Sequence, residues 1–391
     1  MRVLLVTPDS PVGGFGGGAN LSALMHRGLV EAGHSVSVAY VFPASGYAGG
    51  NVGVSLTERA SPSPAAKIRA RFRVEPDFYR PSHRAANQAR DLVKLVKPDR
   101  CVLYGFDTMA AFLSITTVPK AGLFGVLPSK LERVGQRLAR RRGESSALRT
   151  IDVALRRRLS DKNVGTLLQS LCTVVTLARN EADSVARLAP GTRVFYRPNP
   201  TLDEGMAAPG HGVAPYRVVM AGHLRGGATL AGLDFFARKI VPALERRGVL
   251  GDFRFEIVGK HEPPTWLRAL LPSDVTFTGF VENFGQHVGS ADAYLVPIPD
   301  DVGNRSRIAG AWSAGACVVT HASSEPGMPE IERGVNALGG ETAAELAAAL
   351  VTACTRREVN AAVRAGGRQT YERIFRPEIA LPALVTALVD A

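Results

Sequence analysis

The 391-residue sequence contains few cysteines and few aromatic residues, and it has no long uninterrupted apolar run. Its four cysteines, Cys101, Cys172, Cys317 and Cys354, lie far apart and form no Cys-x-x-Cys pair. This spacing, without histidine partners, predicts no metal site. We expect all four to be free, buried thiols in a reducing compartment.

The lack of a long apolar run argues against a transmembrane helix, which needs about 20 consecutive apolar residues. The most apolar region, 101–127, is interrupted by Asp107, Pro119 and Lys120. The first residues enter a strand-like pattern at once, so no secretory signal is expected. Aromatic residues amount to only 7%, and no known binding module is recognisable, which argues against nucleic acid as a partner. We therefore expect a cytoplasmic globular protein.

Charge is distributed unevenly along the chain. Residues 1–200 contain 29 Lys and Arg and 14 Asp and Glu, a net charge of +15, whereas residues 201–391 carry −3. This asymmetry indicates an anionic partner for the first half. The helical pattern 129–162 is rich in arginine, including positions 137, 140, 141, 142, 149, 156, 157 and 158. These arginines would suit an anionic membrane surface, which would make the protein peripheral at the inner face of the membrane; a solvated helical face is the alternative.

Short apolar runs alternate with amphipathic stretches throughout the chain, which is typical of parallel βαβ units. Strands are predicted at 2–7, 35–41, 100–104, 173–177, 217–221, 253–258, 275–278, 293–297 and 317–320. Helices are predicted at 20–32, 66–97, 129–162, 233–246, 305–314, 343–355, 356–372 and 377–389. The fold class is therefore α/β, with two Rossmann-like doubly wound domains facing across a cleft.

A stretch rich in proline and glycine divides the chain. It follows the Arg-Pro-Asn-Pro step at 197–200 and has a linker composition over 201–214. We expect an N-terminal domain over 1–200 and a C-terminal domain over 215–375. The last helix, about 376–391, is predicted to pack back on the N-terminal domain.

A series of different short motifs follows in a fixed order along nearly the whole chain. They comprise Gly17-Gly18, Gly33-His34, Pro198-Asn199-Pro200, Gly222-His223-Leu224, Ile257-Val258-Gly259, Gly279-Phe280-Val281, Gly303-Asn304-Arg305-Ser306-Arg307-Ile308 and Ala314-Gly315. In this order and spacing the chain resembles glycosyltransferase family 4, whose members have the glycosyltransferase B fold. The resemblance implies an N-terminal acceptor-binding domain and a C-terminal donor-binding domain.

The resemblance also implies an activity. It predicts a retaining glycosyltransferase that moves a sugar from a nucleotide-diphosphate sugar to a hydroxyl group. The acceptor would be lipid-linked, a polysaccharide or a secondary metabolite. No cofactor and no divalent metal is implied, because no Asp-x-Asp pair stands out and arginines can bind a diphosphate in its place.

Arg305 and Arg307 would hold the diphosphate at the start of a helix, beside Gly303, Asn304, Ser306 and Ile308. Two arginines on a solvated helix end are the alternative. Gly222, His223, Arg225 and Gly259 are predicted to contact the donor from two other loops. His223 could equally cap its loop, and Arg225 could equally face solvent.

Phe280 and Val281 are expected to meet the base through their backbone, with the Phe280 side chain in the core. Gly17 and Gly18 would allow close approach of a sugar or phosphate, or form a simple turn. Asp107, expected in a loop after a strand, is a candidate catalytic contact to the acceptor hydroxyl or the sugar; a surface aspartate is the alternative.

Two of the departures from the family pattern concern glutamates. Val302 and Gly310 stand where the family has glutamates, and the second of these glutamates holds the nucleotide ribose. The departure motivates an alternative hypothesis, a catalytically silent binding or scaffold protein on the same fold. A sugar-nucleotide epimerase is a third hypothesis, although the acidic cleft residues that it would need are not found.

Overall fold

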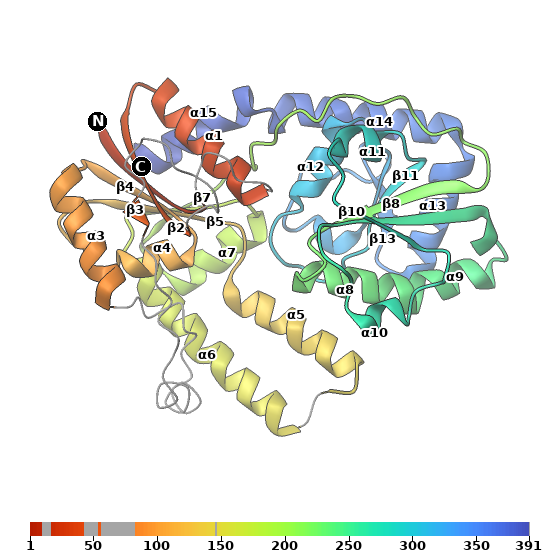
Figure 1. Ribbon diagram of the computed structural model, residues 1–391, viewed down its shortest axis with the longest axis horizontal. Coiled ribbons are helices and arrows are strands. Elements are labelled where there is room, and N and C mark those ends of the chain that lie inside the picture. The colour runs from red at the N-terminus through yellow and green to blue at the C-terminus, as the bar shows by residue number, and fades with distance from the viewer. Residues whose placement is uncertain (10–16, 43–53, 56–82, 145–146, 391) are drawn as a thin grey trace. The chain divides into compact units, whose positions relative to one another are not determined.

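A computed structural model describes the chain except residues 10–16, 43–53, 56–82, 145–146 and 391 (Figure 1). The described residues form two compact units. The first unit contains Met1–Glu132, Ser146–Pro200 and Pro377–Ala391, and the second contains Arg133–Ser145 and Thr201–Arg376. The short segment Arg133–Ser145 thus belongs to the second unit, although its position in the sequence suggested the first.

The first unit contains a seven-stranded parallel sheet in the order β3-β2-β1-β4-β5-β6-β7. Its strands are β1 (Arg2–Asp9), β2 (Ser35–Phe42), β3 (Val54–Ser55), β4 (Arg100–Tyr104), β5 (Lys120–Phe124), β6 (Thr173–Thr176) and β7 (Arg193–Tyr196). Its helices are α1 (Gly17–Glu31), α3 (His83–Val96), α4 (Phe106–Ala111), the first turn of α5 (Pro128–Arg141), α6 (Ala147–Gln169), α7 (Arg179–Leu188) and α15 (Pro377–Val389).

Both faces of this sheet are covered by helices, so its central strands are apolar on both sides. Successive residues of β1 alternate between the two cores: Leu4 and Val6 face the helices α3, α4, α6 and α7, whereas Val3 and Leu5 face α1 and α15. Gly28 of α1 permits the close approach of α15, because a Cβ atom there would lie 2.6 Å from Leu381 Cγ. The C-terminal helix therefore packs within the first unit.

The second unit contains a six-stranded parallel sheet in the order β10-β9-β8-β11-β12-β13. Its strands are β8 (Tyr216–Ala221), β9 (Phe253–Val258), β10 (Thr276–Gly279), β11 (Ala293–Val296), β12 (Val318–His321) and β13 (Leu338–Gly340). Its helices are α8 (Gly227–Phe235), α9 (Val241–Arg246), α10 (Thr265–Arg268), α11 (Phe284–Gly289), α12 (Ser306–Ser313), α13 (Ala343–Thr355) and α14 (Arg357–Thr370), together with the rest of α5.

Two apolar clusters pack this second sheet. Helices α8, α9 and α13 cover one face, and α11 and α12 cover the other, where Trp312 is fully buried. The indole Nε1 of Trp312 donates to the carbonyl of Asn336 at 2.8 Å, so its polar atom is satisfied inside the core. Figure 1 shows the sheet of this unit between its two helical layers.

Several elements differ from the sequence predictions. The pattern 129–162 forms two helices, because Gly143 takes a left-handed φ of 72° just after α5 and ends it. The pattern 233–246 starts earlier, at Gly227, and includes a π-helical turn over Phe236–Ile240. The sequence does not predict strands β3, β5, β7 and β13. Of the helix expected at 66–97, residues 66–82 lie outside the described residues.

Two properties expected from composition can also be compared with the structure. Within the described residues, no helix is both long enough and apolar enough to cross a membrane. All four cysteines are free, but only three are buried. Cys172 is exposed, because it lies just before β6 at the amino end of the strand, so the expectation of four buried thiols was wrong.

Candidate functional site

The order of strands reverses beside β8 in the second sheet. The chain passes from β8 to β9 and β10 on one side, and only then to β11 on the other. The loops that follow β8 and β11 therefore diverge at the carboxyl edge of the sheet, which we define as the loops after its strands. In open parallel sheets, this reversal is where ligands bind.

Glycines allow the backbone to pack closely at this edge. A Cβ atom on Gly259, after β9, would lie 2.4 Å from the carbonyl oxygen of Gly222, after β8. A Cβ atom on Gly222 would in turn lie 2.6 Å from Nη1 of Arg307. Gly279, at the end of β10, adopts a left-handed φ of 72°. Backbone geometry thus favours glycine at 259 and 279, whereas a side chain at 222 would have to displace Arg307.

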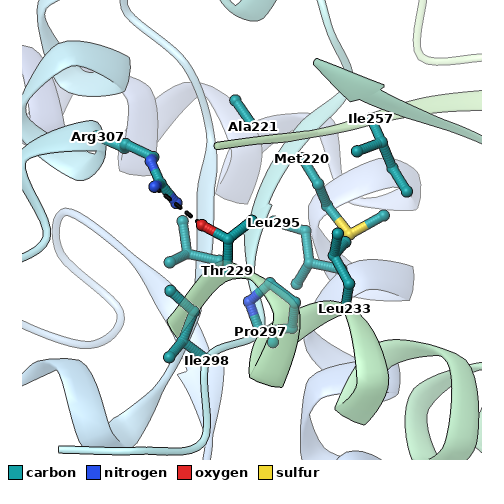
Figure 2. A pocket seen from close by; sticks show the side chains of 11 residues that line it. Met220, Ala221, Thr229, Leu233, Ile257, Leu295, Pro297, Ile298 and Arg307 are labelled. Carbon is teal, nitrogen blue, oxygen red and sulfur yellow. Dashed lines mark hydrogen bonds between the residues drawn. The ribbon is translucent and has the colours of Figure 1, made fainter. Parts of the chain in front are cut away.

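Arg307, in the first turn of α12, extends toward the end of β8. Its Nη2 donates to Oγ1 of Thr229 on α8 at 3.0 Å (Figure 2). Burial lowers the pKa of this guanidinium, while the nearby Tyr294 opposes the shift. An arginine remains protonated in proteins, so Arg307 places a positive charge beside the Gly222 backbone.

A small cavity lies next to Arg307. Its volume is about 20 Å³, and its lining is mostly apolar, with Met220, Leu233, Ile257 and Leu295 among the residues around it (Figure 2). A cavity of this size has room for about one water molecule. It is therefore a packing void beneath Arg307 and too small for a nucleotide or a sugar.

Arg305 is placed differently, although it stands only two residues before Arg307. It is 6% exposed, and its guanidinium donates to the carbonyl oxygens of Val302 and Asp300 in its own loop. Burial lowers the pKa of Arg305 to about 10, helped by the charge of Arg307. The side chain holds the loop between β11 and α12 together, so in this arrangement it is not directed at a ligand.

The remaining residues of this segment shape the start of α12. Gly303 has a left-handed φ of 60°. The side-chain Oδ1 of Asn304 accepts the N–H of Ser306, the first residue of α12, at 2.8 Å, and Ile308 is fully buried in the core. The side chains of Asn304 and Ile308 are therefore structural here, and a ligand could meet the backbone amides that remain free at the start of α12.

Four basic side chains gather at the ends of β8 and β9. The rings of His223 and His261 meet edge to face with centroids 4.9 Å apart. Partial burial and the neighbouring charges of Arg225, His223 and Lys260 lower the pKa of His261. Since His223, Arg225 and Lys260 are exposed, this cluster presents positive charge at the carboxyl edge.

Sequence reasoning had identified His223 and Arg225 but had missed Lys260 and His261. The signal was present, because these two residues follow Gly259 directly after a strongly predicted strand. Two basic residues at that position point to an anion, since carboxyl ends of parallel strands share one edge.

Phe280 follows Gly279 at the same edge. Its side chain is 61% exposed, so the expectation that it packs in the core was wrong. The left-handed turn at Gly279 ends β10 and directs the next side chain outward, whereas Val281 packs against the core. An exposed aromatic ring at the carboxyl edge is suited to stacking on a planar group.

Three predicted site residues belong to the first unit. Gly17 and Gly18 are the first residues of α1, so they open a helix as expected. Asp107 lies in the first turn of α4 rather than in a loop, after Gly105 with a left-handed φ of 89°. It is at the carboxyl end of β4, the edge at which α/β sheets bind ligands.

The two departures from the family pattern also have clear positions. Val302 is buried in the loop before α12. Gly310 is buried within α12, and a Cβ atom there would only touch the ring of Phe284 at 3.7 Å. Among the described residues, no group of three or more His, Cys, Asp or Glu is arranged to hold a metal ion.

Residues 215–356 match the family model of the glycosyl transferases group 1. This match covers the sheet of the second unit and the loops described above. Residues 215–356 therefore have the sequence pattern of a group 1 glycosyltransferase domain, which confirms the resemblance found in the sequence at this broader level.

Solved structures agree in fold with this chain. Sucrose-phosphate synthase from Thermosynechococcus elongatus superposes with a TM-score of 0.68 at 12% identity, covering 98% of this chain and 96% of that one. WaaG, a glycosyltransferase involved in lipopolysaccharide biosynthesis, gives a TM-score of 0.63 at 13% identity, covering both chains fully. Anabaena HepE, solved with UDP and glucose, gives 0.64 at 12% identity, covering 99% and 98%.

These similarities show the glycosyltransferase B fold, with its two α/β domains, and the predicted fold class is confirmed. No curated protein matches the sequence of this chain.

Proposed function

We propose that the protein transfers a glycosyl group, with retention of configuration, from a nucleotide-diphosphate sugar to a hydroxyl acceptor. The observation that carries this proposal is the basic carboxyl edge of the second sheet, where Arg307 packs on Gly222 and the cluster around His261 lies beside it. The matched family and the UDP bound to Anabaena HepE support a nucleotide donor.

In the proposed reaction, the bond between the anomeric carbon of the sugar and the terminal phosphate oxygen breaks. The acceptor oxygen bonds to that carbon, and its proton passes to the leaving diphosphate. Negative charge grows on the diphosphate as the bond breaks. Arg307 and the free amides at the start of α12 would stabilise this charge in place, which is a large term in catalysis.

The other residues of the edge have distinct proposed roles. His223, Arg225, Lys260 and His261 would attract the diphosphate, and the Phe280 ring would stack on the base. Arg305 would act only through the loop that it holds. In the first unit, Gly17, Gly18 and Asp107 remain the proposed contacts to the sugar and the acceptor.

A nucleotide panel tests the proposal. UDP, GDP and ADP are each titrated by calorimetry and by thermal unfolding, where a ligand at about 100 times its Kd should add about 2.7 kcal/mol of stability. The sugar nucleotide of the base that binds is then assayed for slow hydrolysis, in which water replaces the unknown acceptor. Binding without hydrolysis, or no binding, would instead favour a catalytically silent protein, the alternative that Val302 and Gly310 suggest.

We also propose a cytoplasmic location with peripheral binding to anionic membrane. Helix α6 exposes Arg158 and Ile151, a basic and an apolar side chain. Arg137 and Arg141 of α5 pair with Asp300 and Asp234, which reduces the basic surface expected from sequence. Sedimentation with anionic phosphatidylglycerol vesicles and with neutral phosphatidylcholine vesicles tests this. Neutralising a basic residue that touches the membrane should weaken binding to the anionic vesicles by about 1 kcal/mol per charge.

A further inference from the structure

The loop between β11 and α12 contains two buried charges. Asp300 is 2% exposed and Arg305 is 6% exposed. Arg305 holds the loop through the carbonyls of Asp300 and Val302, and it leads directly into the turn that carries Arg307. Because a buried carboxylate without a partner is costly, the conformation of this loop depends on a cation that reaches Asp300.

That cation is Arg137 of α5. Its Nη1 lies 2.6 Å from Oδ1 of Asp300, and both residues belong to the second unit. The other oxygen of Asp300, Oδ2, and Nε of Arg305 are buried and have no hydrogen-bond partner within the described residues. Among the described parts of the chain, Arg137 thus provides the one ion pair of this carboxylate.

Further contacts fix the same end of α5. Arg141, one helical turn after Arg137, lies 3.5 Å from Asp234 of α8, a residue that is 1% exposed. Arg142 lies over the ring of Trp266 in α10, 4.6 Å from its centroid. Asp234 has a second partner, Arg238 at 2.9 Å, so it depends less on α5 than Asp300 does.

We propose that Arg137 and Asp300 are positioning residues, which hold the loop between β11 and α12 so that Arg307 lies against Gly222. The proposal rests on the proposed function, because it assigns a task to the pair at the same site. Neither side chain needs to touch the ligand. Loss of the pair would leave the buried Asp300 carboxylate without the hydrogen bond from Arg137, and the loop would open to hydrate it.

The first experiment measures the loop itself and requires no activity. Amide hydrogen exchange of residues 298–308 is compared among the wild type, Arg137→Ala and Arg140→Ala. Arg140 is an exposed arginine on the same helix, for which the structure records no ion pair within the described residues. We expect exchange at 298–308 to rise at least tenfold in Arg137→Ala, to stay unchanged in Arg140→Ala and to be partly restored in Arg137→Lys.

The second experiment is a double-mutant cycle with Arg137→Ala, Asp300→Asn and the combined variant. The ligand is whichever of UDP, GDP and ADP binds the wild type. Each single change should weaken the binding of this nucleotide by about tenfold. The combined variant should be no weaker than either single variant, because both remove one contact.

The outcomes separate the two proposals. If none of the three nucleotides binds the wild type, the proposed function is overturned. If the wild type binds but exchange and affinity are unchanged in Arg137→Ala, or if the two changes are additive, the positioning role alone is overturned. Circular dichroism of each variant verifies that the variants are folded.

Discussion

The two halves of the chain differ in net charge, but the more basic half is not where the cationic cluster of the candidate site lies. Residues 1–200 carry +15 and residues 201–391 carry −3, yet the cluster of Arg225, Lys260 and two histidines belongs to the nearly neutral half. In the basic half, Lys120 is buried against the carbonyls of Phe112 and Leu113, where it binds backbone. Where cations lie relative to strand ends matters more for phosphate binding than how many a domain contains.

The strongest test of this comparison is Arg307→Ala. It should lower hydrolysis of the sugar nucleotide by about a hundredfold, because a charge aimed at the leaving group is lost. Arg307→Lys should retain much of the activity, since a cation remains. Arg158→Ala, on α6 of the basic half, should leave the rate unchanged. Equal losses in the Arg158 and Arg307 variants would show that overall charge, and not position, governs the reaction.

A smaller loss is expected from Gly222→Ala, which adds one methyl group at the end of β8. The new Cβ would lie 2.6 Å from Nη1 of Arg307 and must displace that side chain. We expect a roughly tenfold lower rate with modest loss of stability, since overpacking costs about 1–3 kcal/mol. Gly251→Ala is the matched control, because no atom lies within 4 Å of its added Cβ. A rate unchanged from wild type would separate Arg307 from the reaction.

Phe280→Ala should weaken nucleotide diphosphate binding by about fivefold or more, since stacking of a base on an aromatic ring contributes about 1–3 kcal/mol. Phe280→Tyr should bind normally. Calorimetry with the nucleoside diphosphate and with inorganic pyrophosphate distinguishes base from phosphate: only the nucleotide should lose affinity. Equal losses for both ligands would rule out stacking as the role of this ring.

The smallest effect concerns pH. Because the pKa of His261 is lowered, the ring is neutral near pH 7 and gains a proton as the pH falls. A bound diphosphate favours that proton, so affinity should rise from pH 7.5 to pH 6, by about threefold. The dependence of affinity on pH should be weaker in His261→Gln. This variant also corrects for titration of the phosphate itself. Identical slopes in both proteins would remove His261 from the site.

Strand ends were the part of the candidate site that the sequence located well. Strands β4 and β9 and helices α13 and α15 have the predicted bounds, because apolar runs and their breakers reveal both periodicity and limits. Gly222, Gly259 and Gly303 stand at the carboxyl edge for the same reason. The prediction for the Phe280 side chain was wrong because it rested on the apolar character of the residue. The direction of a side chain after a left-handed glycine depends on the geometry of the turn.

The directions of the Arg305 and Arg307 side chains could not be predicted from the sequence. A motif with two arginines assigned both to a ligand, but one binds carbonyls of its own loop and the other faces Gly222 and Thr229. The pair between Arg137 and Asp300 joins residues 163 positions apart, and nothing in local spacing could announce it.

The sequence by itself indicated the two α/β domains and the resemblance to glycosyltransferases, because periodicity, glycine turns and motif order are local properties of the chain. Only the tertiary structure decided which cationic side chains meet at the carboxyl edge and which bind the carbonyls or carboxylates of loops. The direction of a long, flexible side chain is set by the buried carbonyls and carboxylates around it, and those come from distant parts of the chain.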